Sequence, residues 1–305
     1  MKNQNQEKKD TILELANEYD DGEKSEKALK RYKKQAEAGN TDAQNLIGAM
    51  YYYGEGAEQD YGKAFEWYKK AAQAGNVDAQ PSLGWMYETG KGTEQDYQKA
   101  FEWYKKAAQA GHPRAQHNLA CLYEKGEGTE QDYDKALAYH LKAAKQGFAD
   151  AQFKLGLKYE IGKGVKQVDS KAFEWYAKAA EQGHVNAQYN LGCMYEKGRG
   201  VGQNDAKAVE WFTKAAEQDD ADAQCNLAFM FAEGRGVEQD VSKAVELFSK
   251  AAVQGHERAQ YCLHLLRQKN KGFLGQIRKI WTKISTSILS ATTAPQKQAK
   301  NYGNK

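Results

Sequence analysis

The sequence holds no run of about 18 consecutive apolar residues, the length that a membrane-spanning helix usually needs. Its first residues, MKNQNQEKK, carry positive charge, but the apolar stretch of a secretory signal peptide does not follow them. We therefore expect a cytoplasmic protein with no spanning helix. Secretion by a route that reads no such signal is the alternative.

Cysteine is scarce, with four residues in the chain, and the four form no recurring pair. Small domains that depend on disulfides carry cysteines at regular, paired spacings. Cys121 and Cys193 occupy equivalent positions of the repeat described below, whereas Cys225 and Cys262 lie at others. We expect four free thiols that pack as small apolar side chains.

Several catalytic patterns are missing as well. No serine has lysine at the third following position, no His-x-His-x-Asp zinc pattern occurs, and residues 22–25 (GEKS) lack the earlier glycine of a phosphate-binding loop. The six histidines are dispersed, and His112, His184 and His256 share one loop position, where helix capping explains them better than metal ligation. Because no nucleophile, base and orienting group assemble, we predict a protein that is not an enzyme and binds no cofactor or metal.

The overall composition, with 41% hydrophobic and 28% charged residues, is typical of a soluble globular protein. Its charge is unevenly placed. Residues 271–305 hold seven Lys and Arg and no Asp or Glu, so with a total of +3 the rest of the chain carries −4. A mildly acidic body is thus followed by a basic tail.

A 36-residue repeat organises most of the sequence. An alanine that opens an Ala-Gln pair recurs, without insertion or deletion, at Ala43, Ala79, Ala115, Ala151, Ala187, Ala223 and Ala259. Units of this size cannot bury their own apolar face and are typical of proteins built by stacking. The repeat predicts one elongated all-α array.

Each unit is expected to contain two helices joined by a glycine-rich loop. In the second unit, residues 79–87 and 100–108 place apolar side chains at spacings of three and four, which is the helical period. Gly90 should close the first helix in the left-handed conformation, and Asp96 should cap the start of the second. The helices should be about 13 residues long, or ~20 Å.

Two residues depart from this scheme. Pro81 lies about a turn inside a first helix, where it removes a backbone donor, and it predicts a late start or a kink. Val168 stands where the other units have a capping Asp or Asn. Asp169 follows it, so we expect the cap to shift by one residue.

The framework of the second unit reads Ala-x-x-x-Leu-Gly-x-Met-Tyr-x-x-Gly-x-Gly and then Asp-Tyr-x-Lys-Ala-x-x-Trp-Tyr-x-Lys-Ala-Ala-x-x-Gly. This pattern, which runs from about residue 28 to residue 266, resembles the Sel-1-like repeat family, relatives of the tetratricopeptide repeats. The resemblance implies a right-handed α-solenoid of helix-loop-helix units. Its first helices would line a concave groove that binds other proteins, so the expected function is a scaffold or adaptor.

The implied groove assigns candidate binding residues to positions two, six and nine after each opening alanine, since spacings of four and three keep them on one helical face. These positions vary while the framework repeats. The leading candidates are Asn45, Tyr52, Trp85, Glu88, His117, Glu124, Phe153, Glu160, Tyr189, Glu196 and Phe229. The four glutamates are expected to form an acidic row suited to a basic or amphipathic partner segment, and no nucleic acid is expected.

Other interpretations stay open. Apolar candidates such as Leu157, Cys193 and Phe229 would also be explained by contact with the neighbouring unit, and repeated glutamates by a solvated face. Some cysteine-rich members of the resembled family are named β-lactamases, so a hydrolase is an alternative function. The oligomeric state is left open.

Both ends depart from the repeat. We expect residues 1–10 and 292–305 to be disordered and residues 11–269 to form the solenoid, with a half-unit at 28–42, six units from 43 to 258 and a half-unit at 259–269. Residues 270–291 should form a basic amphipathic helix that caps the solenoid, lies on an anionic membrane or fills the groove. Its apolar stripe is Phe273, Ile277, Ile280, Trp281, Ile284 and Ile288.

Overall fold

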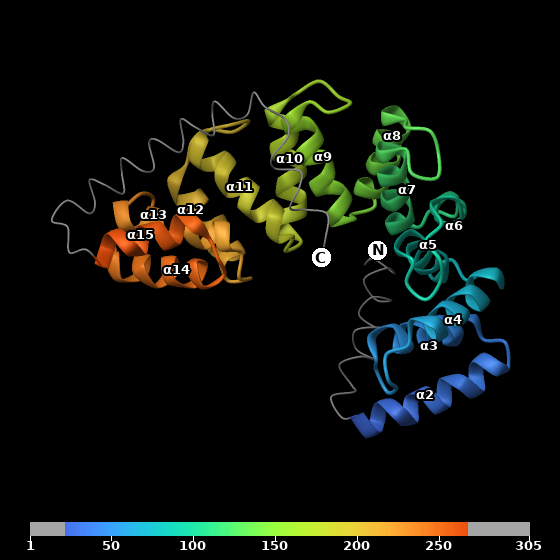
Figure 1. Cartoon of the computed structure of the whole chain (residues 1–305). Coiled ribbons are helices and arrows are strands. Elements are labelled where there is room, and N and C mark those ends of the chain that lie inside the picture. The colour runs from blue at the N-terminus through green and yellow to red at the C-terminus, as the bar shows by residue number, and fades with distance from the viewer. Residues whose placement is uncertain (1–21, 268–305) are drawn as a thin grey trace, which may run out of the picture. The chain divides into compact units, whose positions relative to one another are not determined.

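The computed structural model describes residues 22–267, and its regular structure in that range is entirely helical (Figure 1). The described helices are α2 (Gly22–Glu37), α3 (Thr41–Tyr53), α4 (Tyr61–Gln73), α5 (Ala79–Thr89), α6 (Tyr97–Gln109), α7 (Pro113–Lys125), α8 (Tyr133–Lys145), α9 (Ala149–Ile161), α10 (Asp169–Glu181), α11 (Val185–Lys197), α12 (Asp205–Ala216), α13 (Ala221–Glu233), α14 (Val241–Val253) and α15 (Glu257–Arg267). The odd-numbered helices are the first helices of the repeats, and the even-numbered ones from α4 onward are the second helices.

The helices fall into two compact units. The first runs up to Gln146 and contains α2 to α8, and the second starts at Gly147 and contains α9 to α15. Within each of them, every helix packs against the next one along the chain, as Figure 1 shows. The predicted all-α solenoid of two-helix repeats is confirmed.

Short polar residues and glycines set the helix ends, as the sequence predicted. Asp96 accepts a 2.9 Å hydrogen bond from the amide of Lys99 at the start of α6, and Asp60, Asp132, Asn204 and Asp240 cap their helices in the same way. Gly90 closes α5 with φ of +71°, a conformation that L-residues rarely adopt.

Pro81 and Val168, the two residues that depart from the repeat, have different effects on their helices. The first helix with Pro81 starts late, since α5 begins at Ala79 whereas α3 begins two residues before its own alanine, at Thr41. The predicted cap shift at Val168 is wrong: α10 starts at Asp169, in register with the other second helices, and Val168 provides no side-chain cap. The Asp169 carboxylate binds an arginine of the next repeat instead.

The core of a repeat is built from a large ring set against glycine. Tyr104 is fully buried on α6, and a Cβ at Gly84 on α5 would lie 2.8 Å from its ring. That distance is shorter than any ordinary van der Waals contact, so only glycine lets the two helices approach this closely. The same arrangement joins Gly156 to Tyr176, where the distance would be 2.4 Å.

The second loop glycine of each repeat contacts the backbone of the preceding repeat. A Cβ at Gly92 would lie 2.0 Å from the carbonyl oxygen of Tyr61, at the start of α4. Gly128 has the same relation to Tyr97, at 2.1 Å. The paired glycines are thus a turn that lets backbone rest on backbone between successive repeats.

Pairs of glutamines, each with a buried first-helix amide and an exposed second-helix amide, form a second joint. Gln116 donates a hydrogen bond to the carbonyl of Ala108, at the end of the preceding repeat, and its own side-chain oxygen accepts a 2.8 Å bond from Gln146. Three later repeats contain the same glutamine pair, at 2.6, 2.8 and 3.0 Å. In the repeat before, Ala110 stands in the place of Gln146, and within residues 22–267 the buried side-chain oxygen of Gln80 accepts no hydrogen bond.

Several predictions lie outside the described residues. These are the disordered ends at 1–10 and 292–305, the amphipathic helix at 270–291 and its apolar stripe from Phe273 to Ile288.

Candidate functional site

The first helices carry the candidate binding positions, and the structure places them at different depths. Four candidates of the first compact unit are half-buried and retain some solvent exposure: Asn45, Tyr52, Trp85 and His117. Phe153 and Phe229, in the second unit, are 5% and 2% exposed. The candidate surface is therefore more open on α3, α5 and α7 than on α9 and α13.

An aromatic cluster connects two successive first helices. The rings of Tyr52 on α3 and Trp85 on α5 meet edge to face with centroids 5.4 Å apart. Lys91 follows α5, donates a 2.9 Å hydrogen bond to the Tyr52 hydroxyl, and places its ammonium 4.8 Å from the Trp85 ring centroid. Tyr53 beside them is 66% exposed. The cluster offers apolar ring surface and polar groups together, which is the composition of binding hot spots.

The glutamates nine residues after the opening alanines bond inside their own repeats. Glu88 accepts a 2.7 Å hydrogen bond from the hydroxyl of Tyr104, and Glu160 accepts one of 2.6 Å from Tyr176. Burial raises the pKa of both tyrosines well above the ordinary value, and the glutamate charge adds to that shift. Each phenol therefore stays protonated as a donor, and each carboxylate holds a second helix against a first one.

Arg199 adds a contact between repeats. Its guanidinium donates 3.0 Å hydrogen bonds to Glu160 and to Asp169, both in the preceding repeat. Bidentate arginine contacts of this kind fix geometry more strongly than a single ion pair does. Arg199, like Lys91, lies twelve residues after its opening alanine, so this position connects neighbouring repeats in both units.

Glu196 is the most deeply buried of the four glutamates, with 5% of its side chain exposed. It binds the guanidinium of Arg235 in the next repeat. Burial raises the pKa of Glu196 to about 7, and the charge of Arg235 offsets that effect only in part. All four expected groove glutamates thus have a partner within the chain, with Glu124 next to His140, rather than forming an open acidic row.

The candidates of the second unit serve packing. Phe153 stacks on His184 with ring centroids 4.5 Å apart, and Phe229 meets Phe248 edge to face at 5.0 Å. Tyr189 is half-buried against the core that contains Phe153. The two ring contacts lie within one repeat each, whereas the alternative interpretation expected contact with the neighbouring repeat, so that interpretation stays a prediction.

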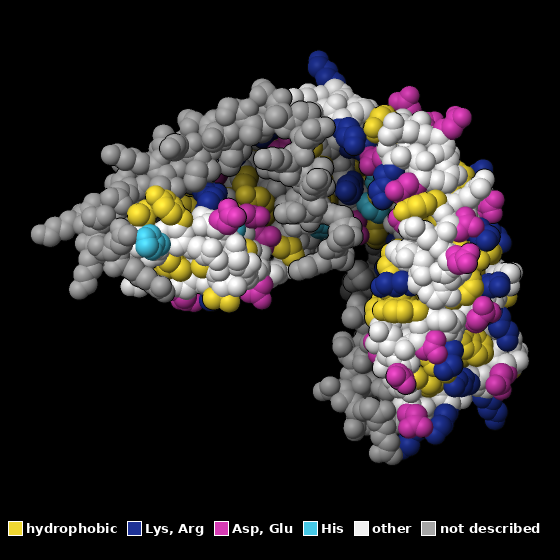
Figure 2. All heavy atoms as spheres, in the orientation of Figure 1, with side chains coloured by type: hydrophobic (Ala, Val, Ile, Leu, Met, Phe, Trp, Pro, Cys, Tyr) yellow, Lys and Arg dark blue, Asp and Glu magenta, His cyan; other side chains and the backbone are white. Residues whose placement is uncertain are grey.

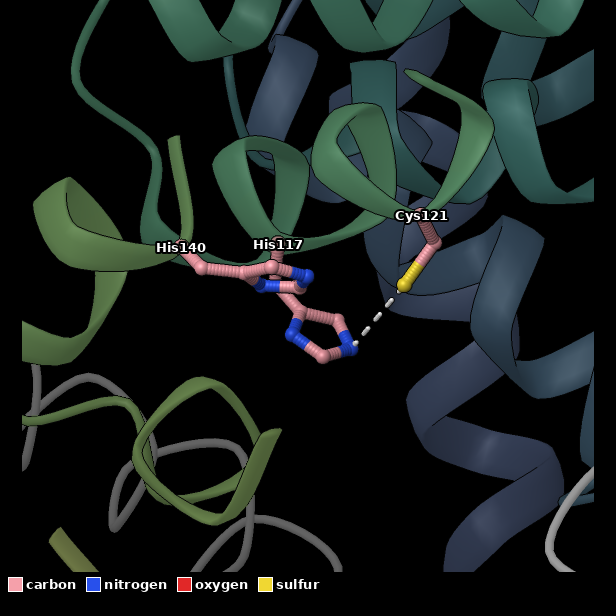
Figure 3. A group of neighbouring side chains, drawn as sticks. All are labelled: His117, Cys121 and His140. Atoms are coloured by element: carbon pink, nitrogen blue, oxygen red, sulfur yellow. Dashed lines mark hydrogen bonds between the residues drawn. The ribbon is translucent and has the colours of Figure 1, made fainter. Parts of the chain in front are cut away.

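The third repeat brings two histidines and a cysteine together (Figure 3). His117 and Cys121 lie one turn apart on α7, with His117 Nε2 3.7 Å from Cys121 Sγ. His140 reaches in from α8, fully buried, and its ring centroid is 5.1 Å from that of His117. One donor atom from each residue lies within 4.8 Å of the other two. Glu124 is next to them, with its Oε1 3.6 Å from His140 Nε2.

Sequence reasoning treated the histidines as dispersed and missed this cluster. The signal that could have found it is the repeat register. His140 occupies the position of the buried rings Tyr68, Tyr104, Tyr176, Phe212 and Phe248, which places it against the first helix of its own repeat. His117 and Cys121 were already assigned to one face of that helix.

The capping role predicted for the shared histidine position is confirmed. The ring nitrogens Nδ1 of His112, His184 and His256 accept hydrogen bonds from backbone amides at 3.4, 3.2 and 3.2 Å. Each of them also lies near an aspartate of the preceding repeat, at 3.1 to 3.7 Å from Nε2. Burial lowers the pKa of His112, which keeps its Nδ1 available as an acceptor.

Comparison with known proteins covers the same part of the chain. Six consecutive segments match a family model described as Sel1 repeat, at residues 41–76, 77–112, 113–148, 149–184, 185–220 and 221–256. Each matched segment begins two residues before the opening alanine, where most first helices start.

Two solved structures are similar over most of the chain. One is a protective antigen of uropathogenic Escherichia coli displaying an SLR fold, with 38% identity over 82% of this chain and a TM-score of 0.72; this chain spans 55% of its length. The other is a Sel1 repeat protein from Oxalobacter formigenes, with 34% identity, a TM-score of 0.72, and coverage of 80% of this chain and 99% of that one. None of the curated proteins compared with the chain matches it.

Proposed function

This chain belongs to the Sel1 repeat family, and we propose that it acts as a scaffold that holds a segment of a partner protein against the first helices of its repeats. Repeat arrays of this kind mediate protein–protein interaction in general. We place the partner on α3, α5 and α7, because the variable positions of these first helices are partly exposed.

The observation that carries the proposal is the half-exposed aromatic pair Tyr52 and Trp85. Two successive repeats contribute one ring each, at positions nine and six after the opening alanine, and no other repeat has Tyr or Trp at these positions, so neither ring is needed to repeat the framework. Large aromatic side chains with one open face lose little conformational entropy on binding and dominate interface energies. The exposed Tyr53 extends the same surface.

The chemistry of the cluster favours an amphipathic or extended segment with an apolar anchor. Glu88 already accepts a hydrogen bond from Tyr104, so a purely basic ligand would find fewer available carboxylates than the sequence predicted. On the face of the first unit drawn in Figure 2, basic and acidic side chains are interspersed. A mixed surface of this type favours apolar anchoring with polar contacts at its rim.

The other functions weighed from the sequence gain no supporting contact. Absence of enzymatic activity stays a prediction, and so does the absence of nucleic acid binding. No helix among the described residues 22–267 is long and apolar enough to cross a membrane. The membrane-adaptor alternative depends on residues 270–291, which lie outside the described part of the chain.

The test uses short random peptides displayed as a library and selected on the full chain. Trp85→Ala should lower the affinity for the selected peptides by about tenfold or more, because a central aromatic anchor contributes more than ~1.4 kcal/mol of binding free energy. Trp103→Ala is the matched control. It removes the same ring from the second helix α6, where Lys106 covers it at 5.1 Å, and should leave affinity unchanged.

Circular dichroism establishes that both variants keep the wild-type helix content. If peptides selected on the wild type bind Trp85→Ala as well as they bind the wild type, or lose affinity equally in the Trp103→Ala control, the first-helix surface is not the binding site. The proposal would then be wrong for this part of the array.

A further inference from the structure

We propose that His117, Cys121 and His140 form a binding site for a thiophilic divalent metal ion, with Zn²⁺ as the best match. The three side chains come from both helices of the third repeat and converge on one point (Figure 3). The site is separate from the Tyr52 and Trp85 cluster and does not depend on the scaffold function.

The geometry suits a tetrahedral ion. Zinc bonds are about 2.0–2.1 Å long to nitrogen and 2.3 Å to sulfur. In a tetrahedral site, a ligating nitrogen and a ligating sulfur are therefore about 3.6 Å apart. His117 Nε2 and Cys121 Sγ are 3.7 Å apart. The donor atom of His140 lies within 4.8 Å of both. A side-chain rotation that moves this atom by about an ångström would therefore complete a three-ligand set.

The donor set selects the class of metal. Two imidazole nitrogens and one thiolate suit borderline and soft ions such as Zn²⁺ and Co²⁺, whereas Mg²⁺ and Ca²⁺ require oxygen ligands. Binding displaces the Cys121 thiol proton to solvent as the sulfur–metal bond forms, and the metal remains divalent. Three protein ligands leave a fourth position for water or for a group on a partner.

Glu124 lies where a small shift would give the outer contact that ligating histidines usually have. Its Oε1 lies 3.6 Å from His140 Nε2 and 17% of its side chain is exposed. A carboxylate in this place accepts the N–H of the ligating ring and fixes the ring's orientation. The corresponding glutamates, Glu88 and Glu160, accept from tyrosines, so the third repeat keeps the carboxylate and changes the group that it holds.

The third repeat also changes the residue opposite the ring. In four repeats that residue is a glycine, at Gly48, Gly84, Gly156 and Gly192, and a Cβ there would lie 2.4–2.8 Å from the buried ring. Ala120 takes this position opposite the smaller imidazole of His140. The repeat therefore departs from the framework at two facing positions, together with a histidine and a cysteine one turn apart.

The experiment titrates the full chain, free of affinity tags and kept reduced, with Co²⁺ and then with Zn²⁺. Cobalt is used because tetrahedral Co²⁺ with a thiolate ligand gives intense visible bands and a sulfur-to-metal charge-transfer band. We expect one ion per chain, displacement of Co²⁺ by Zn²⁺, and a Zn²⁺-dependent rise in the melting temperature.

Three variants test the ligands. Cys121→Ser should abolish the charge-transfer band. The double variant Ala120→Gly/His140→Tyr reproduces the Gly84 and Tyr104 pair of the neighbouring repeat, so it should fold and should bind metal at least about tenfold more weakly. Cys193→Ser is the matched control, because Cys193 holds the same repeat position next to Tyr189 and should be dispensable.

The proposal is overturned if the wild-type chain gives no saturable Co²⁺ spectrum. It is also overturned if the thiolate band survives in Cys121→Ser or disappears in Cys193→Ser, or if the double variant binds as tightly as the wild type. Metal binding at the capping histidines alone would leave the spectrum without a thiolate band and unchanged in all three variants, which likewise refutes the assignment.

Discussion

Substituting Ala110 by glutamine should stabilise the protein by extending its series of glutamine pairs by one repeat. In four consecutive repeats a glutamine at the end of the second helix donates to the buried glutamine of the first helix, as Gln146 does to Gln116 at 2.8 Å. The repeat with Gln80 has Ala110 in that place. Ala110 and Gln146 have the same backbone conformation, with φ and ψ of −74° and 1° against −83° and 2°. A glutamine at residue 110 can therefore adopt the geometry already present at residue 146.

The expected gain in the free energy of unfolding depends on the buried side-chain oxygen of Gln80. Within residues 22–267, the side-chain oxygen of Gln80 accepts no hydrogen bond, and a buried acceptor in this state costs about 1–3 kcal/mol. Ordering a glutamine side chain costs up to ~2 kcal/mol of rotamer entropy. We expect Ala110→Gln to gain about 1 kcal/mol. In the opposite direction, Gln146→Ala leaves the oxygen of Gln116 without its donor and should lose about 1–2 kcal/mol.

Thermal unfolding followed by circular dichroism measures both changes. At this chain length, 1 kcal/mol corresponds to a shift of about 2–4 °C in the melting temperature. Ala110→Met is the control, since methionine has nearly the shape of glutamine and no donor, and it should give no gain. A melting temperature that does not rise in Ala110→Gln, or that rises equally in Ala110→Met, would refute the hydrogen-bond account.

Two further predictions concern the joints between repeats. Gly92→Ala should destabilise the chain by about 1–3 kcal/mol more than Gly75→Ala, because both residues have positive φ, at +71° and +94°, but a Cβ would meet the Tyr61 carbonyl at 2.0 Å only at Gly92. Urea unfolding of the two variants measures the difference, and equal losses would show that the joint tolerates a side chain. The raised pKa of Glu196 predicts that its contribution to stability is present below pH 4.5 and is lost as the pH rises to about 7, since the unfolded state releases the proton first. Stability measured between pH 5 and pH 8 should therefore fall by up to about 3 kcal/mol more in the wild type than in Glu196→Gln, and parallel pH profiles would contradict this.

Most of the architecture could be predicted from the sequence because the repeat fixes local chemistry at known intervals. Gly90 and Asp96 mark helix ends through backbone conformation and capping, which depend on a few adjacent residues. Pro81 delays its helix for an equally local reason. Val168 shows the limit of this reasoning, because α10 begins in register with the other second helices although no side chain caps its start.

The candidate site was harder to predict because it depends on contacts between helices. The spacing of Glu88 on its helix is compatible with a groove, but the hydroxyl that it binds belongs to Tyr104, sixteen residues further on. The convergence of His117 with His140 has the same origin, since the two residues lie on different helices of one repeat. Comparing each position with its equivalents in other repeats would have shown that a histidine had replaced a buried ring.

The contact that Gly92 makes with Tyr61 also has a consequence for symmetry. It joins the loop of one repeat to the second-helix start of the repeat before it, so the two surfaces that meet are different. Surfaces of this kind are heterologous, and a pair of them cannot be related by a two-fold axis. A second copy that used this joint at an uncovered end of the array would add head to tail, and the product would be a ring or a filament rather than a two-fold dimer.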